Sequence, residues 1–273
     1  MRNVAIYHCS IRIIGRSKGR SAVAYAAYCS GTKLYDKEVR KTYNYTGQNS
    51  VVHSEINLPQ NAPSEFYDRE KLWNAVHEIE TRSDAQLARE VEVALPREFI
   101  RQEQIDTVRE YIMKNFVREG MCADWALHDK GDGNPHAHIM LTMRAIKPNG
   151  RWAEKSRTIY KLDPNGQKIP VIDPTTGQQK IGARGRKMWQ RETVPANDWN
   201  DHSKAEKWRA AWARECNKRL DQQHQIDHRS YDRQEVDKAS TIHEGHVARK
   251  MEREGLVSDR CEINREIREL NEQ

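Results

Sequence analysis

Paired cysteines and long apolar runs are both missing from this sequence of 273 residues. The five cysteines are scattered and none forms a CxxC, which indicates neither a zinc knuckle nor a disulfide framework. No apolar run reaches the length of about 18 residues that a membrane-spanning helix needs. The start, MRNVAIYHCS, also lacks the apolar core of a signal peptide. These absences predict a protein of the reducing cytoplasm with no membrane contact.

Charge is abundant but unevenly spread. Apolar residues make up 37% of the chain and charged residues 32%, which is typical of a soluble protein with much solvated helix surface. The net charge is +6. Residues 144–191 hold twelve Lys and Arg against three acids, a net charge of +9, so the rest of the chain carries 6 − 9 = −3. This basic island indicates contact with a polyanion, although a solvated, mobile loop would have the same composition.

The apolar pattern predicts an α+β fold. Alternating residues predict strands at 3–14, 89–96, 121–128 and 136–144, with short extended pieces near 43–46 and 51–57. Helical spacing predicts helices at 21–31, 63–83, 97–120 and 199–223. We therefore expect a central antiparallel sheet of about five strands with helices packed on one face. The other face would be free for function.

Two regions are expected to extend from this core. The turn signals DPNGQ and DPTTGQ flank KIPVI, so residues 144–197 are predicted to form a long basic β-hairpin excursion. Residues 1–231, which include this excursion, would form the working domain. Residues 232–273 are polar and are expected to be a charged helical linker toward a further C-terminal region.

Three histidines stand close together in HDKGDGNPHAHIML. His136 and His138 are two apart on a predicted strand, so their side chains share one face. The turn at 129–135 can bring His128 beside them. Three imidazoles can hold one divalent cation and leave positions open, as a catalytic metal requires. A closed zinc site would need a fourth ligand, and no cysteine is near in sequence.

The chemistry of such a metal depends on its substrate. A three-histidine hydrolase would use the cation to generate hydroxide. The basic island argues instead for a phosphodiester, on whose oxygen the cation would act as a Lewis acid.

Tyrosines and glutamates offer further reactive groups. Tyr25 and Tyr28 are three apart on one face of the helix predicted at 21–31. A phenol is a poor nucleophile unless a metal withdraws charge from the phosphate and a base accepts its proton. Glu90 and Glu92 share one strand face, opposite the valines, where an acid can orient a metal-bound histidine or accept a proton. Packing tyrosines and exposed glutamates would give the same pattern.

Six stretches of the sequence occur in the order found in one known protein family. They are AIYHCS, GRSAVAYAAY, REVEVALP, HDKGDGNPHAHIM, WRAAWARECNKRL and IDHRS. With them, residues 3–231 resemble the MobA/MobL (MobQ-type) relaxases of conjugative and mobilisable plasmids, in the HUH endonuclease superfamily. The histidine stretch and its spacing are the most specific of the six.

The resemblance implies both a fold and a function. The fold is palm-like, around a central antiparallel sheet. A relaxase nicks one DNA strand at an origin of transfer by transesterification, stays covalently bound to the 5′ phosphate, and later rejoins the strand. The implied partners are single-stranded DNA and a hairpin at that origin, together with relaxosome accessory and coupling proteins. The implied setting is the cytoplasm of a bacterium that carries the plasmid.

The resemblance also implies residue roles. The family nucleophile maps onto Tyr28, and Tyr25 is the second choice because relatives often carry another residue there. The acid-bearing strand maps onto Glu90 and Glu92, without a preference between them. The metal ligands map onto His128, His136 and His138. The family is described as working with Mn or Mg, whereas imidazole ligands also suit Zn or Ni.

Two basic sets are expected to contact the DNA backbone. The first flanks the predicted nucleophile helix and comprises Arg12, Arg16, Lys18 and Arg20. The second belongs to the basic island and comprises Arg184, Arg186, Lys187 and Arg191. Trp152 and Trp189 could stack on bases there, or pack in a core.

Three other functions share parts of this pattern. A rolling-circle replication initiator of the same superfamily would use the same residues, although WRAAWARECNKRL and IDHRS favour the relaxase. A non-catalytic DNA-binding protein would use the metal for structure. A metal-hydroxide hydrolase would not need either tyrosine.

Overall fold

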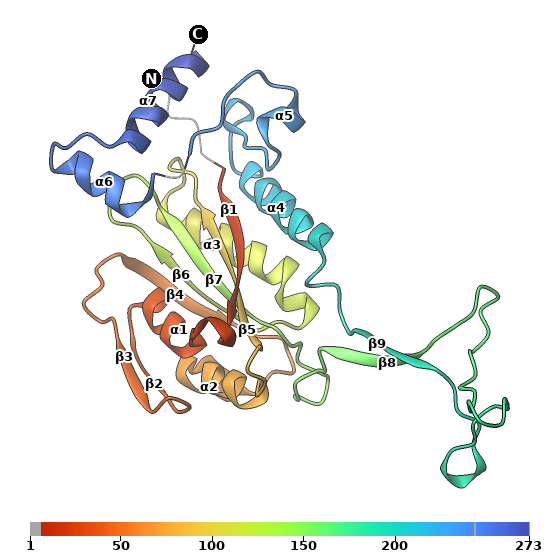
Figure 1. Ribbon diagram of the computed structural model, residues 1–273. Helices are drawn as coiled ribbons and strands as arrows, with labels where there is room; N and C mark the ends of the chain where they lie inside the picture. The colour runs from red at the N-terminus through yellow and green to blue at the C-terminus, as the bar shows by residue number, and fades with distance from the viewer. Residues whose placement is uncertain (1–6, 243, 273) are drawn as a thin grey trace.

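A computed structural model describes residues 7–242 and 244–272 of the chain (Figure 1). The first residues of the strand predicted at 3–14, residues 3–6, lie outside the described residues. A five-stranded antiparallel sheet forms the centre, in the order β1-β5-β7-β6-β4. The strands are β1 Cys9–Gly15, β4 Val51–Asn57, β5 Gln86–Ala94, β6 Ala123–His128 and β7 His136–Thr142. The α+β class and the central sheet are therefore as predicted.

Two helices cover one face of the sheet. They are α3 Arg101–Asn115 and α4 His202–Asn217, and Figure 1 shows them behind the sheet and along its side. Alternate residues of the central strands point to them, including Val91, Trp125 and Ile139, all of which are buried. Trp208 and Trp212 of α4 join the same core, as their helical spacing indicates. A large apolar core thus fixes the positions of the three central strands.

Helices also pack on the second face, which we expected to be free. They are α1 Ala22–Ser30 and α2 Arg69–Ile79. Ala88 and Met140 point to this face and are buried with residues of α1 and α2. Further along the same strands this face carries Glu90 and His138. The face is therefore apolar at one end, where helices cover it, and polar at the other. The expectation of helices on one face only was wrong, because apolar residues at one end of the second face pack against α1 and α2.

The ends of α1 follow from its sequence. Ser21 is the N-cap and accepts a hydrogen bond from the backbone N–H of Ala24. Gly31 ends the helix with a φ of 64°, a left-handed conformation that favours glycine. Both ends match the prediction. The helix predicted at 63–83 begins later, as α2, with Asp68 as its N-cap, because residues Ser64–Tyr67 form a separate short 3₁₀ turn.

A two-stranded ribbon projects from the body, and Figure 1 shows it as a long arm. It consists of β8 Ser156–Tyr160 and β9 Arg191–Pro195, paired antiparallel. Isolated bridges such as Leu162↔Lys168 and Ile181↔Lys187 continue the pairing toward the tip. The predicted hairpin excursion is present in this form, and we call residues 156–195 the arm.

The remaining elements are short or peripheral. A second small hairpin, β2 Lys33–Asp36 and β3 Lys41–Asn44, packs beside α1. The chain ends in helices α5 Tyr231–Gln234, α6 Gly245–Arg253 and α7 Asp259–Glu272. Other 3₁₀ turns are Arg16–Lys18, Val117–Glu119, Ala183–Gly185 and Gln222–His224. Within the described residues, no helix has the length and apolarity needed to cross a membrane.

Candidate metal centre and its tyrosines

The three predicted histidines meet at the end of β6 and the start of β7. His128 pairs directly with His136, and His138 pairs with Ala126 two residues further along the strands. The turn between the strands uses Gly131 and Gly133 in the left-handed region, with φ values of 72° and 74°. The ring centroids lie 4.8 Å apart for His128 and His138, 5.1 Å for His136 and His138, and 5.4 Å for His128 and His136.

Each of these imidazoles has one nitrogen beside an oxygen acceptor. Nε2 of His128 lies 2.6 Å from the backbone oxygen of Cys29, at the end of α1. Nδ1 of His136 lies 2.9 Å from the backbone oxygen of Asn134, and Nδ1 of His138 lies 2.8 Å from Oε1 of Glu90. A nitrogen that faces an oxygen carries the proton, so the other nitrogen of each ring keeps its lone pair.

Burial keeps two of these rings neutral. Desolvation is the main cause that lowers the pKa of His128 to about 4, and the other two histidines lower it further. Desolvation also lowers the pKa of His136. Neutral imidazole is the form that binds a metal, so these histidines are ready to act as ligands at neutral pH.

The donor set fits a divalent cation. One ligand nitrogen from each histidine lies within 4.8 Å of the others. Three imidazole nitrogens can supply three of the donors that a divalent cation requires, which is fewer than a closed coordination sphere needs. Cys29, Glu90 and His138 form a second close group. Burial raises the pKa of the Cys29 thiol well above its usual value, so the thiolate needed for metal binding is disfavoured.

Glu90 and Glu92 have different surroundings. Glu90 is fully buried and accepts hydrogen bonds from His138, Arg12 and the Tyr25 hydroxyl. Burial alone would raise its pKa, but these three bonds outweigh it and hold the pKa at about 2. Glu92 is partly exposed, and Arg12 lies 3.5 Å from its carboxylate. Glu90 is therefore the acid that is hydrogen-bonded to one of the three histidines, a distinction that the sequence left open.

The two tyrosines of α1 also differ. The Tyr25 hydroxyl donates to buried Glu90 and accepts a bond of 2.7 Å from Arg12. Tyr28 is 41% exposed, and its ring centroid lies 6.4 Å from that of His138. Burial, followed by Cys29, Glu92 and Glu90, raises the pKa of Tyr28, so its phenol stays protonated at neutral pH. Tyr25 is held in the network, whereas Tyr28 is available beside the histidines.

The predicted basic residues near α1 separate into three groups. Arg12 bonds Glu90 and Tyr25, and its side chain is still 49% exposed. Arg16 bonds Glu38 and the backbone oxygen of Glu80, which ties the first 3₁₀ turn to α2. Lys18 and Arg20 are exposed near the start of α1. Of these four cations, Arg16 is the least exposed, whereas Arg12, Lys18 and Arg20 are all open to solvent.

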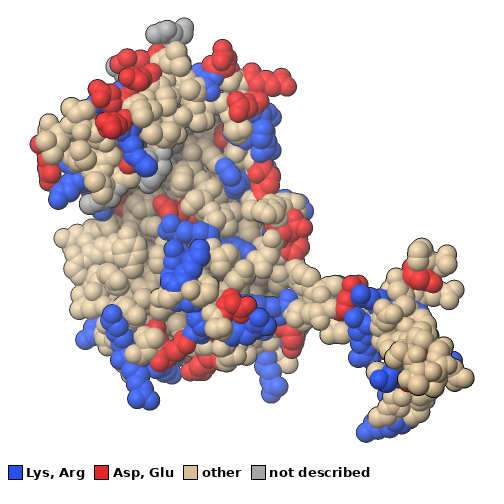
Figure 2. Space-filling view, viewed as in Figure 1, with Lys and Arg blue, Asp and Glu red and all other residues tan. Residues whose placement is uncertain are grey.

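The basic residues of the arm do not lie at the histidines. Arg184, Arg186 and Lys187 are exposed near its tip, and Arg191 lies over the ring of Tyr160 at 5.0 Å. Figure 2 shows blue side chains spread over the arm as well as over the body. Trp189 belongs to the arm and is bridged to Pro170. Trp152 stacks on Phe66 at 5.2 Å and so packs against the core.

Sequence reasoning missed two neighbours of the site. The backbone oxygen of Cys29 fixes His128, and only the packing of α1 on the sheet reveals it. Tyr45 makes an edge contact with Tyr28, with ring centroids 5.6 Å apart. Its place in a short extended piece gave no signal for this contact.

Comparison with known proteins gives one family. A family model described as "MobA/MobL family" matches residues 20–254. The chain is 43% identical over 272 residues to the "Probable mobilization protein MobA" of Bifidobacterium longum, covering 98% of this chain and 48% of that protein. It is 35% identical over 288 residues to the "Conjugal transfer protein TraA" of Agrobacterium fabrum, covering 98% of this chain and 24% of that protein. The chain therefore spans half or less of these relatives.

A solved structure is also similar. It is titled "Molecular Basis of Vancomycin Resistance Transfer in Staphylococcus aureus" and matches with a TM-score of 0.62 and 27% sequence identity. The match covers 85% of this chain and 96% of that chain, so the likeness extends over most of the fold described above.

Proposed function

The chain belongs to the MobA/MobL family of relaxases, and from this premise we propose that it nicks one DNA strand at an origin of transfer by metal-dependent transesterification. The observation that carries the proposal is the approach of an exposed tyrosine on α1 to three converging histidines. A nucleophile beside a site for a Lewis acid is what phosphodiester transesterification requires.

Tyr28 is the proposed nucleophile. Its phenol oxygen attacks the phosphorus, the bond from phosphorus to the 3′ oxygen breaks, and a 5′-phosphotyrosine ester forms. The departing 3′ oxygen takes a proton from water and becomes a free 3′ hydroxyl. The ester keeps the energy of the broken bond, so attack by a 3′ hydroxyl rejoins the strand and releases the tyrosine. Exposure of Tyr28 gives a strand access to its hydroxyl, which supports this assignment over Tyr25.

Glu92 is the proposed acceptor of the phenol proton. Its carboxylate is partly exposed on the open face, and its charge is one of the causes that raise the pKa of Tyr28. Glu90 is unsuited to this role because three hydrogen bonds already occupy its carboxylate. In the reverse step Glu92 would return the proton to the departing phenolate.

The cation would be held by His128, His136 and His138. When bound, a divalent ion would withdraw charge from a phosphate oxygen and so favour attack at phosphorus. Glu90 fixes His138 through its Nδ1, and the carbonyl oxygens of Cys29 and Asn134 fix the other two rings. Manganese or magnesium is the proposed physiological ion, and zinc or nickel would also suit the nitrogen donors.

Tyr25 is proposed to position Glu90. Arg12 and the Tyr25 hydroxyl hold the buried carboxylate from two sides, and that carboxylate in turn holds His138. Burial raises the pKa of Tyr25 further from neutrality, which disfavours it as a nucleophile.

The proposed substrate is the single strand beside a hairpin at the origin. Lys18 and Arg20 near α1, together with the basic residues of the arm, would contact its phosphates. Relaxosome accessory and coupling proteins are proposed partners in the bacterial cell that carries the plasmid. Because the chain spans 48% and 24% of the two relatives above, the activity of a whole relative stays a proposal here.

Adduct formation tests the proposal. The chain is incubated with labelled strands from candidate origins and with Mn²⁺ or Mg²⁺, and the products are separated under denaturing conditions. A covalent protein–DNA adduct that maps to Tyr28 is expected. DNA binding without any adduct, under both ions and with every origin strand, would favour the non-catalytic alternative.

A further inference from the structure

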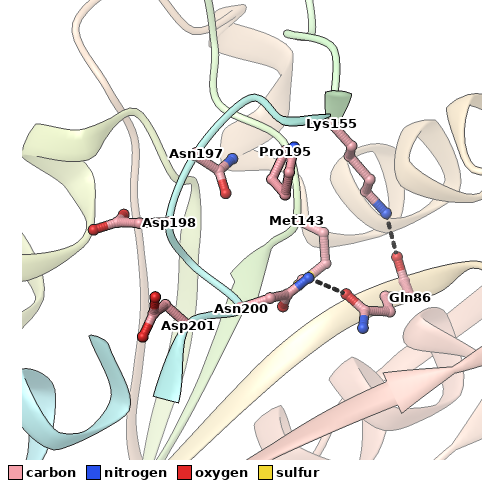
Figure 3. Close-up of a pocket in the computed structure, with 8 residues that line it drawn as sticks. All are labelled: Gln86, Met143, Lys155, Pro195, Asn197, Asp198, Asn200 and Asp201. Atoms are coloured by element: carbon pink, nitrogen blue, oxygen red, sulfur yellow. Dashed lines mark hydrogen bonds between the residues drawn. The ribbon is translucent and has the colours of Figure 1, made fainter. Parts of the chain in front are cut away.

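A cavity of about 280 Å³ lies where the arm joins the body (Figure 3). Gln86, at the start of β5, lines it from the sheet, and Pro195, at the end of β9, lines it from the arm. Glu92, the strand partner of His138, lies six positions along β5 from Gln86. At about 3.3 Å per residue this is roughly 20 Å. The cavity is therefore separate from the histidine site.

A buried arginine sets the orientation of two amides at the cavity. Arg89 is 4% exposed, and its Nη2 donates to Oδ1 of Asn200 at 2.6 Å. Since arginine can only donate, the amide oxygen of Asn200 must face it. Nδ2 of Asn200 then donates to Oε1 of Gln86 at 3.1 Å, as the dashed line in Figure 3 shows. The amide nitrogen of Gln86 is left as the group that this side chain offers to a ligand.

Arg89 itself has unused hydrogen-bonding capacity. Its Nη1 is buried and has no hydrogen-bond partner among the described residues. Its guanidinium lies 5.1 Å from the Trp208 ring centroid, and burial lowers its pKa to about 10. An unpaired donor in the interior costs free energy. The arginine that orients the Asn200 and Gln86 amides would therefore be stabilised by any added hydrogen-bond acceptor.

The loop before α4 supplies the other polar groups. The side-chain oxygen of Asn197 accepts from the backbone N–H of Trp199 at 3.1 Å, which leaves its amide nitrogen as a donor. Asp198 and Asp201 add carboxylate acceptors to the cavity lining. Each carboxylate has lone pairs beyond those used by Lys204 and by the N–H of Ser203. Met143 and Pro195 contribute apolar surface.

This donor and acceptor pattern selects one class of ligand. A phosphate would be repelled by the two carboxylates. A purely apolar group would leave the amides and acids without partners. A planar heterocycle could lie against the apolar surface while its edge bonds the polar groups. The amide oxygens of Gln86, Asn197 and Asn200 each accept one hydrogen bond already, so the carboxylates are the acceptors with the most free lone pairs.

Separate carboxylate acceptors and amide donors match a base whose edge carries both an exocyclic amino group and an acceptor atom. Guanine, cytosine and adenine have both, whereas thymine has no amino group. We propose that the cavity binds one unstacked base with an exocyclic amino group in the substrate strand and so contributes to its sequence recognition. The inference rests on the proposed function, because it takes a single DNA strand as the ligand.

The position of the cavity suits this role. It opens at the root of the arm, whose Lys and Arg would attract the phosphates of the same strand. Single strands are recognised by bases that leave the stack and bond through their edges in such pockets. Lys155 lines the cavity too and donates to the backbone oxygen of Gln86 at 2.8 Å.

Selection from a random pool tests the inference. The chain is used to enrich binding strands from a single-stranded DNA library, in parallel with Gln86→Met and Asp198→Asn. Gln178→Met, in an exposed turn of the arm, is the matched control. We expect the unmodified chain and the control to select a motif with one position from which thymine is excluded. Both cavity variants should lose preference at that position alone and bind the selected strand roughly tenfold more weakly.

The outcomes separate the two proposals. Enrichment of a motif that both folded variants share in full with the unmodified chain would overturn the cavity as a base site and leave the relaxase function standing. Failure of the unmodified chain to enrich any single-stranded motif would count against the proposed function itself. Thermal unfolding of each variant verifies its fold, and Asp198 is an exposed side chain whose substitution spares the core.

Discussion

The histidine end of the sheet and the arm differ in how their polar side chains are held. At the histidines, Glu90 and His138 are buried and paired, and one nitrogen of each of the three rings has an oxygen partner. Along the arm, strands β8 and β9 are exposed and the basic side chains face solvent. The first arrangement fixes a few atoms for chemistry, whereas the second presents charge over a long reach.

This contrast implies that substitutions in the two regions should change different properties of the protein. Removal of one partner at the histidine end leaves a buried group unpaired, so the effect should be large and specific to the reaction. Removal of one cation on the arm deletes a single screened interaction, so the effect should be modest and should depend on salt. Matched substitutions in each region test this difference.

The largest effect is expected at Tyr28. Phenylalanine at this position removes the proposed nucleophile, so covalent adduct should fall by at least about a thousandfold while strand binding is retained. Tyr25→Phe is the matched control on the same helix, and it should retain adduct within roughly a factor of ten. Quantified adduct on denaturing gels measures both. Normal adduct from Tyr28→Phe, or its loss only in Tyr25→Phe, would reverse the assignment.

The next effect is expected at Glu90. Glu90→Gln removes the negative charge that orients His138 through its Nδ1, so affinity for Mn²⁺ should fall by about 10- to 100-fold. Calorimetric titration with Mn²⁺ measures this directly. Glu92→Gln should leave Mn²⁺ affinity nearly unchanged while slowing adduct formation, because its proposed role is proton transfer. Equal losses of Mn²⁺ affinity in both variants would show that the two acids do not have separate roles.

A smaller effect is expected on the arm. Replacing Arg184, Arg186 and Lys187 by alanine should weaken strand binding severalfold at moderate salt. It should also lower the slope of log affinity against log salt by about 0.7 for each phosphate that the arm no longer neutralises. Adduct formed at saturating strand should stay near that of the unmodified chain. An unchanged salt slope would mean that these residues do not bind phosphates.

Much of the histidine end could be predicted from the sequence because strand alternation is a local property. It placed His136 with His138, and Glu90 with Glu92, on shared faces, and the sheet has them so. The choice between the glutamates could not be predicted. Glu92 pairs with His138 in the strand register, yet Glu90 makes the hydrogen bond, and only the packing of Tyr25 and Arg12 against the sheet explains this.

The covering of the second sheet face was also missed, for a related reason. The Ala-rich helix α1 could be recognised from the sequence. The sheet face on which it packs could not, because the residues it contacts there, Ala88 and Met140, are distant in sequence. The cavity at the arm root was missed as well. Its lining comes from β5, the arm and the loop before α4, and no local pattern joins these segments.

The smallest expected effect is on the pH dependence of stability, which carboxylates of the body should affect and those of the arm should not. Glu55 of β4 is bonded by Arg109 of α3, by Asn57 and by His53. Burial opposes these bonds, but together they lower its pKa to about 2. Because the folded pKa lies below the unfolded value of about 4.3, this stability is present above about pH 4.3 and is lost as the pH falls toward about 2.

Allowing for its partial exposure, the contribution of Glu55 should be about 1–2 kcal/mol in the free energy of unfolding. Denaturant unfolding at several pH values between about 2 and 5 measures it. Glu55→Gln should flatten the curve in this window. Glu192→Gln, on exposed strand β9 of the arm, removes a carboxylate with no ion pair among the described residues and should leave the curve unchanged. If both variants flatten the curve equally, acid sensitivity does not reside in the paired charges of the body, and the contrast with the arm fails.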